Sequence, residues 1–242
     1  MTKLQAVELC GSERFIERLS AQVHDDRVRT MVALGVMAKT DARASALISE
    51  LWNGPVFVRR LVLKSCQGSR DGAQVLRGLG DGSRLVRGQA RKLVALCCND
   101  AQATQALIQA FSTGWHLWLA QQLRQAGRTG PIDALADHIA QGPEHRLLAE
   151  VVPLCSDAGL LRHLPRALSQ PTSAFFARFA LHHPQRFAEA AQAELAKGPL
   201  LGPWKLAVTS ALHELSVRTP DAAVQLLHAR LRHGEGLPPD VI

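Results

Sequence analysis

The feature that most constrains this chain is a short sequence pattern that returns about every thirty residues. It is clearest in Asp81-Gly82-Ser83-Arg84-Leu85-Val86-Arg87, where an acidic residue stands six positions before an arginine. Asn53 to Arg59 repeats this arrangement, and Asp25 to Arg29 holds a shorter form. Apolar residues at the corresponding position of each repeat, which we call register marks, follow one another at intervals of 28 to 31 residues as far as the C-terminal region: Val28, Val58, Val86, Leu117, Leu147, Phe176 and Leu206. A recurrence of this length indicates a helical-repeat array.

Each register mark opens an apolar helical pattern. Val28, Met31, Val32 and Val36 stand at i, i+3, i+4 and i+8, and Val58, Leu61, Val62 and Cys66 repeat that spacing. One face of each helix should therefore be buried. Because a hairpin of about thirty residues cannot cover its own apolar stripe, neighbouring hairpins must stack.

Shorter helices are predicted between these second helices. Asp, Thr or Pro stands at their starts, where side-chain oxygens cap free N–H groups and proline fits the first turn. We expect Asp41, Asp71, Asp100 and Asp157 to mark four of these starts, and Pro153 and Pro165 to stop or kink their helices. The predicted ranges are 42–51, 73–79, 101–111, 132–140, 157–168, 185–197 and 222–232, the last of which is opened by Thr219-Pro220-Asp221.

The sequence thus predicts an all-α fold, a right-handed α-solenoid of about seven hairpins with a period near thirty residues. It predicts one repeat domain over 1–242, with an N-terminal cap helix region in 1–22 and a flexible tail in 233–242. Composition agrees, since 47% of the residues are hydrophobic and Tyr is absent. The core must then consist mostly of Leu, Ala and Val, of which Leu and Ala are strong helix formers.

The pattern resembles HEAT repeats, in which an Asp between the two helices and an Arg early in the second helix form a ladder along the stack. Asp81 to Arg87 carries both residues, and Asn53 to Arg59 keeps the spacing with Asn in place of Asp. Gln141 to Leu147 and Gln170 to Phe176 lack both charges. A period near thirty residues resembles the shorter HEAT-like subclass, and residues 83–140 also resemble HEAT-type proteins of fungi.

The positive charge is concentrated in the N-terminal half. Residues 1–128 hold 18 Lys and Arg against 10 Asp and Glu, whereas residues 129–242 hold 10 against 11. Within residues 59–92, only two acidic residues oppose nine basic ones. In HEAT-like arrays the second helices line the concave side. The predicted binding residues for a partner or a phosphate backbone are Arg59, Arg60, Lys64, Arg84, Arg87, Arg91 and Lys92.

Two interpretations of these basic residues stay open. In one, Arg29, Arg59 and Arg87 are ladder residues tied to turn groups, and the others form a solvated surface. In the other, the basic second helices attract a polyanion or an acidic partner. Two interpretations also stay open for Trp115 and Trp118. Their side chains fit either core packing or an aromatic wall beside a basic groove.

No catalytic or metal-binding motif is recognisable. The sequence contains no HExxH, CxxC or GxSxG, and the adjacent His182 and His183 point to different faces of any helix. Gly78 to Gly82 lacks the Lys-Ser/Thr of a phosphate loop and fits a turn between helices. We therefore expect no metal and no cofactor. The five cysteines, Cys10, Cys66, Cys97, Cys98 and Cys155, are expected to be buried and reduced.

The sequence favours a non-enzymatic scaffold that binds a protein partner on its concave face. The alternative is a nucleic-acid-binding protein. A basic groove with aromatic residues resembles the HEAT-like alkylpurine DNA glycosylases, but their catalytic Asp has no match here. The N-terminus lacks a signal-peptide layout, and no apolar run reaches the ~18 residues that span a bilayer. A soluble intracellular location, cytoplasmic or nuclear, is expected.

Overall fold

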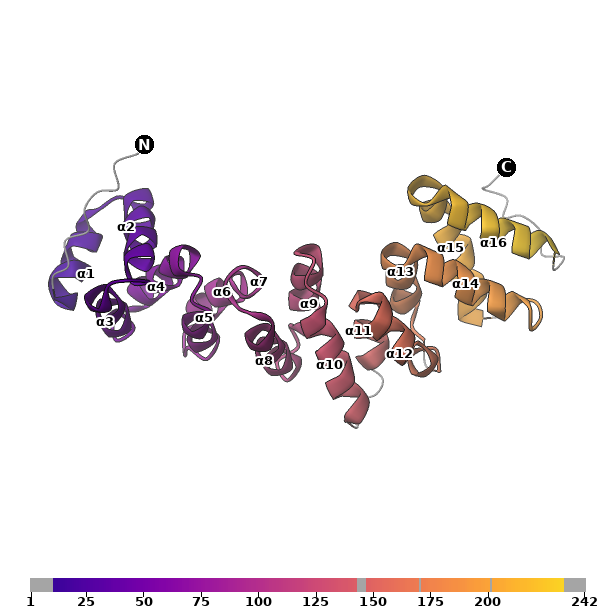
Figure 1. Cartoon of the computed structure of the whole chain (residues 1–242), viewed down its shortest axis with the longest axis horizontal. Coiled ribbons are helices and arrows are strands. Elements are labelled where there is room, and N and C mark those ends of the chain that lie inside the picture. Colours follow the sequence, from indigo (N-terminus) through magenta and orange to yellow (C-terminus); the bar gives the residue numbers. More distant parts are fainter. Residues whose placement is uncertain (1–10, 143–146, 170, 201, 233–242) are drawn as a thin grey trace. The chain divides into compact units, whose positions relative to one another are not determined.

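The computed structural model describes residues 11–142, 147–169, 171–200 and 202–232. Every regular element within these residues is a helix, which confirms the all-α prediction (Figure 1). Contacts divide the chain into two compact units, Met1–Gln122 and Leu123–Ile242, and the boundary falls inside helix α9. Each unit has its own set of buried apolar side chains.

Unit 1 consists of short helices joined by tight turns. Their bounds are α1 (Ser12–Ala21), α2 (His24–Met37), α3 (Ala42–Leu51), α4 (Val56–Ser69), α5 (Gly72–Leu79), α6 (Arg84–Arg91), α7 (Val94–Cys97), α8 (Asp100–Phe111) and the start of α9 (His116–Gln125). Helix α3 has the bounds predicted from the sequence, and α5 and α8 each begin one residue earlier than predicted.

The capping predictions are confirmed in part. The Asp41 side chain accepts a hydrogen bond from the Arg43 N–H, and Asp71 accepts from two N–H groups of α5. At α8, however, Asn99 is the cap and forms a capping box with Gln102. Asp100 is the first helical residue, where its negative charge interacts favourably with the helix N-terminus.

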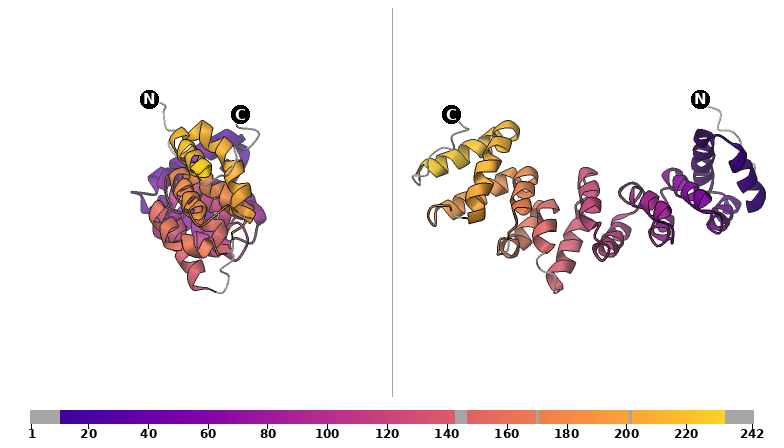
Figure 2. Two further views of the ribbon diagram at one scale, coloured as in Figure 1. Left: turned by 90° about the vertical axis from the view of Figure 1, so that its right-hand side faces the viewer. Right: turned by 180° about the vertical axis from the view of Figure 1, so that it is seen from behind.

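Helices α2 and α4 approach more closely than side chains would allow. They lie side by side (Figures 1 and 2), and glycine stands at both contact points. A Cβ added at Gly35 would lie 2.0 Å from the Ser65 carbonyl oxygen, and one added at Gly68 would lie 2.5 Å from the Val32 carbonyl oxygen. Backbone therefore packs directly against backbone here, and glycine is required by the lack of space.

The predicted apolar stripe is confirmed on α4 and only partly on α2. Val58, Leu61, Val62 and Cys66 are all buried. Of the four predicted residues on α2, Met31 is buried, Val28 and Val32 are half-buried, and Val36 is exposed. Val36 nevertheless lies at the edge of the α2–α4 contact, because its Cγ2 would be 3.0 Å from a Cβ added at Gly68. Each fully buried Leu or Val contributes about 1.5–3 kcal/mol relative to an exposed position.

Unit 2 continues with helices of similar length. They are the end of α9, α10 (Gly130–Gln141), α11 (Leu148–Val151), the 3-10 helix η2 (Val152–Leu154), α12 (Asp157–Ala167), α13 (Ser173–His182), α14 (Pro184–Leu195), α15 (Gly202–Arg218) and α16 (Pro220–Arg232). Pro153 lies in η2 directly after α11, and Pro165 lies inside α12, which ends two residues later. Both positions agree with the predicted early stops.

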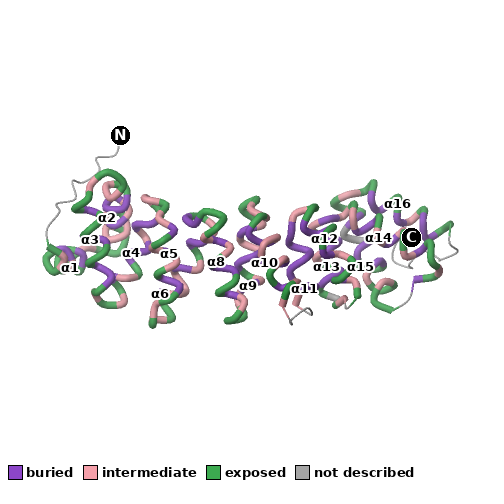
Figure 3. The backbone as a smooth tube through the Cα atoms, turned by 60° about the horizontal axis from the view of Figure 1, so that its bottom comes forward, coloured by how far each residue is buried: buried purple, intermediate pink, exposed green. Residues whose placement is uncertain are grey.

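The core of unit 2 contains an aromatic cluster. Phe175 of α13 contacts Phe176 and Phe179 of the same helix, and Phe187 of α14 and Trp204 of α15 complete the cluster. Helix α13 packs on α15, and α14 packs on α16. Buried and exposed residues alternate within the helices of both units (Figure 3). Around this cluster, the buried residues of unit 2 are mostly Leu, Ala and Val, as the composition predicted.

Several sequence predictions concern buried cysteines, the termini and membranes. Cys66, Cys97, Cys98 and Cys155 are buried free thiols, as predicted, and Cys10 lies outside the described residues. Residues 1–10 of the cap region and the predicted tail 233–242 also lie outside them. None of the helices in the described part of the chain is long and apolar enough to cross a membrane.

Candidate binding face on helices α4 and α6

Some of the predicted basic residues hold turns together. The Arg59 guanidinium donates to both carboxylate oxygens of Asp81, at 2.8 and 3.2 Å, and to the Gly54 carbonyl at 2.8 Å. It thereby joins α4 to the turn before α6. Arg87 donates to the carbonyls of Asp81 and Gly82, and Arg27 makes the same kind of bond to the turn before α2.

The Arg59–Asp81 contact has the geometry of a ladder rung between neighbouring hairpins. Burial alone would raise the pKa of Asp81, but hydrogen bonds from Arg59 and the Ser83 N–H, together with the nearby positive charges, hold that pKa below its usual value. Arg59 and Arg87 thus have structural contacts, as the ladder interpretation expected. Arg29, the third residue of that interpretation, is exposed and lies 3.9 Å from Asp26 of its own helix.

The remaining basic residues have no such contacts. Arg60, Lys64, Arg84 and Lys92 make no ion pair with any carboxylate in the described part of the chain. Arg60, Arg84 and Lys92 are exposed, and Lys64 is half-buried. The structure therefore divides six of the seven predicted residues into turn-binding and solvent-facing groups, a division that charge alone did not determine, and the seventh, Arg91, lies on the Trp115 ring.

Helix α4 presents its cations on one narrow strip. Most of its circumference is buried, and Phe57, Arg60, Lys64 and Gln67 follow at i, i+3, i+7 and i+10 along the open side. Phe57 is 38% exposed although it is a large apolar residue. The strip therefore combines an aromatic ring with two cations.

Helix α6 packs on α4 and has a broader open side. Val86 and Ala90 are buried, and on the opposite side lie Arg84, Leu85, Gly88, Arg91 and Lys92. Leu85 is 59% exposed. We call the open strips of the two helices the cationic–apolar face, defined by Phe57, Arg60, Lys64, Arg84, Leu85, Arg91 and Lys92.

The apolar members of this face were missed by the sequence analysis. A signal was present, because Phe57 and Leu85 each stand one position before the register marks Val58 and Val86 and so fall outside the buried stripe. An apolar residue off the stripe is a candidate for an exposed contact.

Three arginines lie together on the α6 side of the face. Arg84, Arg87 and Arg91 stand at i, i+3 and i+7, which places them on one side of the helix. Burial lowers the pKa of Arg91, and the charges of Arg87 and Arg84 lower it further. No ion pair of Arg91 with a carboxylate is found in the described part of the chain.

Trp115 and Trp118 differ in their surroundings. The Arg91 guanidinium carbon lies 4.5 Å from the centroid of the half-buried Trp115 ring, a cation–π contact. Trp118 on α9 is 39% exposed, so core packing does not describe it. Neither indole N–H makes a hydrogen bond within the described residues. The structure therefore brings Trp115 to the basic residues, while Trp118 stays open to solvent.

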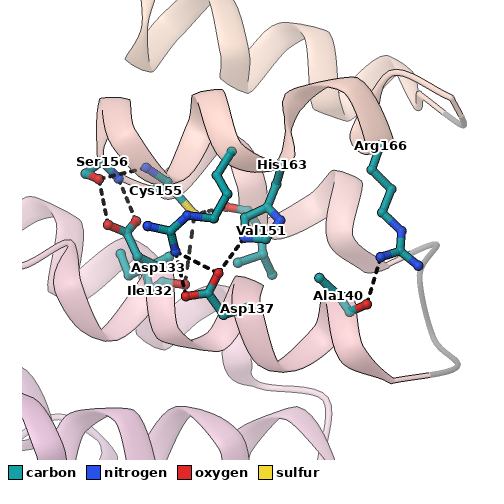
Figure 4. A network of polar contacts seen from close by, with 11 residues as sticks. Ile132, Asp133, Asp137, Ala140, Val151, Cys155, Ser156, His163 and Arg166 are labelled. Atoms are coloured by element: carbon teal, nitrogen blue, oxygen red, sulfur yellow. Dashed lines mark hydrogen bonds and ion pairs between the residues drawn. The ribbon is translucent and has the colours of Figure 1, made fainter.

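A second polar network in unit 2 joins α10 to α12 (Figure 4). Asp133 accepts hydrogen bonds from the N–H and the hydroxyl of Ser156, which itself caps α12 in place of the predicted Asp157. Asp137 contacts both Arg162 and His163 at 2.7–2.8 Å. Partial burial would raise the pKa of Asp137, but these two partners keep it low. These contacts hold the adjacent helices α10 and α12 together.

The histidines predicted to be structural have defined positions. Nδ1 of the buried His183 lies 2.8 Å from an Asp157 carboxylate oxygen. Arg124 donates to the carbonyls of Leu154, Cys155 and His182. In the described residues, no three His, Cys, Asp or Glu side chains converge in a geometry that holds a metal ion.

Comparisons of the chain with family models, curated proteins and solved structures find no significant match. The fold and the candidate face define the chain as an all-α protein with a cationic–apolar surface on its N-terminal unit. The function must be argued from that geometry.

Proposed function

We propose that this chain is a HEAT-like scaffold that binds a protein partner. In this proposal its hairpins form one right-handed α-solenoid of about seven repeats over 1–242. Supporting it are the alternation of first and second helices, the packing of α2 on α4 and of α4 on α6, and the Arg59–Asp81 rung. The second helices are proposed to line the concave side, where the partner binds.

The observation that carries this proposal is the composition of the cationic–apolar face. Arg60, Lys64, Arg84 and Lys92 have no ion-pair partner among the described residues, and Phe57 and Leu85 are exposed between them. Exposed apolar side chains next to unpaired cations suit a protein segment with acidic and apolar residues. The cations steer the encounter, and the apolar contacts add affinity as water is displaced.

Nucleic acid is the second candidate, and one observation favours it. The Arg91 guanidinium lies on the Trp115 ring, and Trp118 is an exposed aromatic side chain; a cation on an aromatic ring suits the binding of bases and phosphates. A glycosylase would also need a carboxylate beside the rings, and no contact of a carboxylate with Trp115 or Trp118 is found in the described residues. The leading proposal therefore remains a binding protein without catalysis.

The test uses a fluorescent helical peptide with Glu on one face and Leu on the other. Its two controls replace Glu by Gln and Leu by Ala, and a single-stranded DNA oligomer represents the alternative. We expect the Glu/Leu peptide to bind more tightly than both controls. Arg60→Glu combined with Lys64→Glu should weaken binding by about tenfold or more, which corresponds to about 1.4 kcal/mol.

Lys205→Glu is the matched control, because Lys205 is an exposed cation of unit 2 and is not a member of the face. Circular dichroism verifies that each variant is folded. Binding of the oligomer alone, with an affinity that falls steeply as salt rises, would replace the protein-partner proposal by the nucleic-acid one. Equal binding of all peptides would refute a role for the face.

A further inference from the structure

Two arginines of α6, Arg91 and Arg87, differ from the solvent-facing cations in being held in place. The Arg91 guanidinium lies on the indole ring, and its Nε is buried without a hydrogen-bond acceptor in the described residues. Arg87 is held by hydrogen bonds, because its Nη1 donates to the carbonyls of Asp81 and Gly82. Two of the three guanidinium groups are thus ordered before any ligand arrives.

Acidic groups do not cancel this charge. Asp81 is the carboxylate that faces the cluster, and its two oxygens already accept from Arg59 and from the Ser83 N–H. Arg84 is exposed and makes no ion pair in the described residues. The cluster therefore keeps a local excess of positive charge that an incoming anion would relieve.

The number and type of donors indicate which anion fits. A planar guanidinium binds carboxylate or phosphate through two parallel N–H bonds, and an ordered one loses less entropy on binding. A carboxylate or a phosphodiester carries one negative charge, whereas a phosphomonoester carries about −1.5 to −2 at pH 7 and has three acceptor oxygens. Three neighbouring cations match the phosphomonoester best.

We propose that Arg84, Arg87 and Arg91, with Trp115 behind Arg91, form a subsite for a phosphorylated side chain on the protein partner. This inference rests on the proposed function and adds a chemical specificity to it. Phe57, Arg60 and Lys64 on α4 then contact the residues that flank the phosphorylated one. Phosphorylation of the partner would thus control its binding.

The test compares the Glu/Leu peptide carrying one central Ser with the same peptide carrying phosphoserine. We expect phosphorylation to tighten binding by roughly tenfold to a hundredfold, the range expected for one to three new charge-assisted hydrogen bonds. Arg91→Gln and Arg84→Gln should remove most of this gain, so that the phosphoserine and Ser peptides bind each variant with nearly equal affinity. Arg91→Lys keeps the charge but lacks the planar fork, and should retain only part of the gain.

Two further readouts separate this subsite from general attraction. The phosphoserine gain should shrink as pH falls below about 6, where the phosphate takes up its second proton. Phenyl phosphate, titrated against the protein alone, should shift the side-chain N–H resonances of the cluster, and Lys205→Gln should leave that shift unchanged. A dT decamer, which carries diesters, should shift them less.

Each outcome decides between the two proposals. If the Ser peptide binds and phosphorylation adds nothing, the phosphate subsite is refuted and the protein-binding function stands. If phenyl phosphate shifts the cluster but no peptide binds, the subsite stands and the partner class is refuted. If the dT decamer binds more tightly than the phosphopeptide, the cluster is a contact for a nucleic-acid backbone, and both proposals are overturned.

Discussion

Substitution by alanine should change the free energy of unfolding in opposite directions at two glycines of unit 1. Gly35 lies in α2 where it meets α4, and Gly88 lies on the open side of α6. An alanine Cβ at Gly35 would lie 2.0 Å from the Ser65 carbonyl oxygen, 2.7 Å from its carbonyl carbon and 3.0 Å from its Cα. At Gly88 the added carbon meets nothing within 4 Å.

The expected magnitudes follow from these distances. Alanine in a helix interior gains about 1 kcal/mol over glycine, so Gly88→Ala should stabilise the protein by about 0.5–1 kcal/mol. The same gain applies at Gly35, but there the two backbones must separate by more than about 1 Å to restore van der Waals contact. Overpacking of a core costs about 1–3 kcal/mol, and more where the obstacle is backbone. Gly35→Ala should therefore be destabilising by about 1–2 kcal/mol or more.

The measurement is urea unfolding followed by circular dichroism, with hydrogen exchange of the α4 amides as a local readout. Gly35→Ala should lower the transition midpoint and speed exchange in α4, while Gly88→Ala should raise the midpoint. Equal stability of Gly35→Ala and the wild type would show that the α2–α4 contact is looser than described. A loss of stability in Gly88→Ala would contradict the assignment of α6's open side.

Three other perturbations have definite signs. Arg59→Ala should destabilise the protein by about 1–2 kcal/mol at pH 7, because it removes charged hydrogen bonds to Asp81. Since the folded pKa of Asp81 is depressed, that difference should shrink as pH falls below about 4, measured by urea unfolding across pH. Burial and nearby arginines lower the pKa of His182 to about 4, so stability should fall between pH 6.5 and 4, and His182→Gln should flatten that dependence. Burial raises the pKa of Cys66 to about 12, so its alkylation by iodoacetamide should be slow until urea unfolds the chain; fast alkylation of the folded protein would contradict its burial.

Helix positions were predictable because their signals are local. Asp41 and Asp71 cap their helices through bonds to N–H groups two or three residues away, so the sequence alone specifies the contact. The error at Asp157 shows the limit of this reasoning. Ser156 has the extended backbone of a cap and is held by Asp133, which is 23 residues distant. A cap that depends on a neighbouring helix cannot be read from the residues beside it.

The candidate face was less predictable, because charge and helical spacing do not determine what each cation contacts. Arg59 and Arg60 are adjacent in sequence, yet one is joined to Asp81 and the other is exposed. A step of one residue turns a side chain by about 100° around a helix, which is enough to move it from a neighbouring turn to solvent. Which of the two side chains meets the turn and which meets solvent depends on the side of α4 that packs against α6.

This division of cations also explains why unpaired charge persists on the face. An arginine at the position of Arg59 or Arg87 meets carbonyls and a carboxylate from a turn, so it stabilises the hairpin. The positions of Arg60, Arg84 and Lys92 offer no such acceptors in the described residues. Together with Lys64 they make four unpaired cations, which repel one another. Replacing these four by Gln should therefore leave the unfolding free energy unchanged or raise it, while abolishing peptide binding. A variant that instead unfolds would show that these side chains hold the fold, and would remove the physical basis for a binding face.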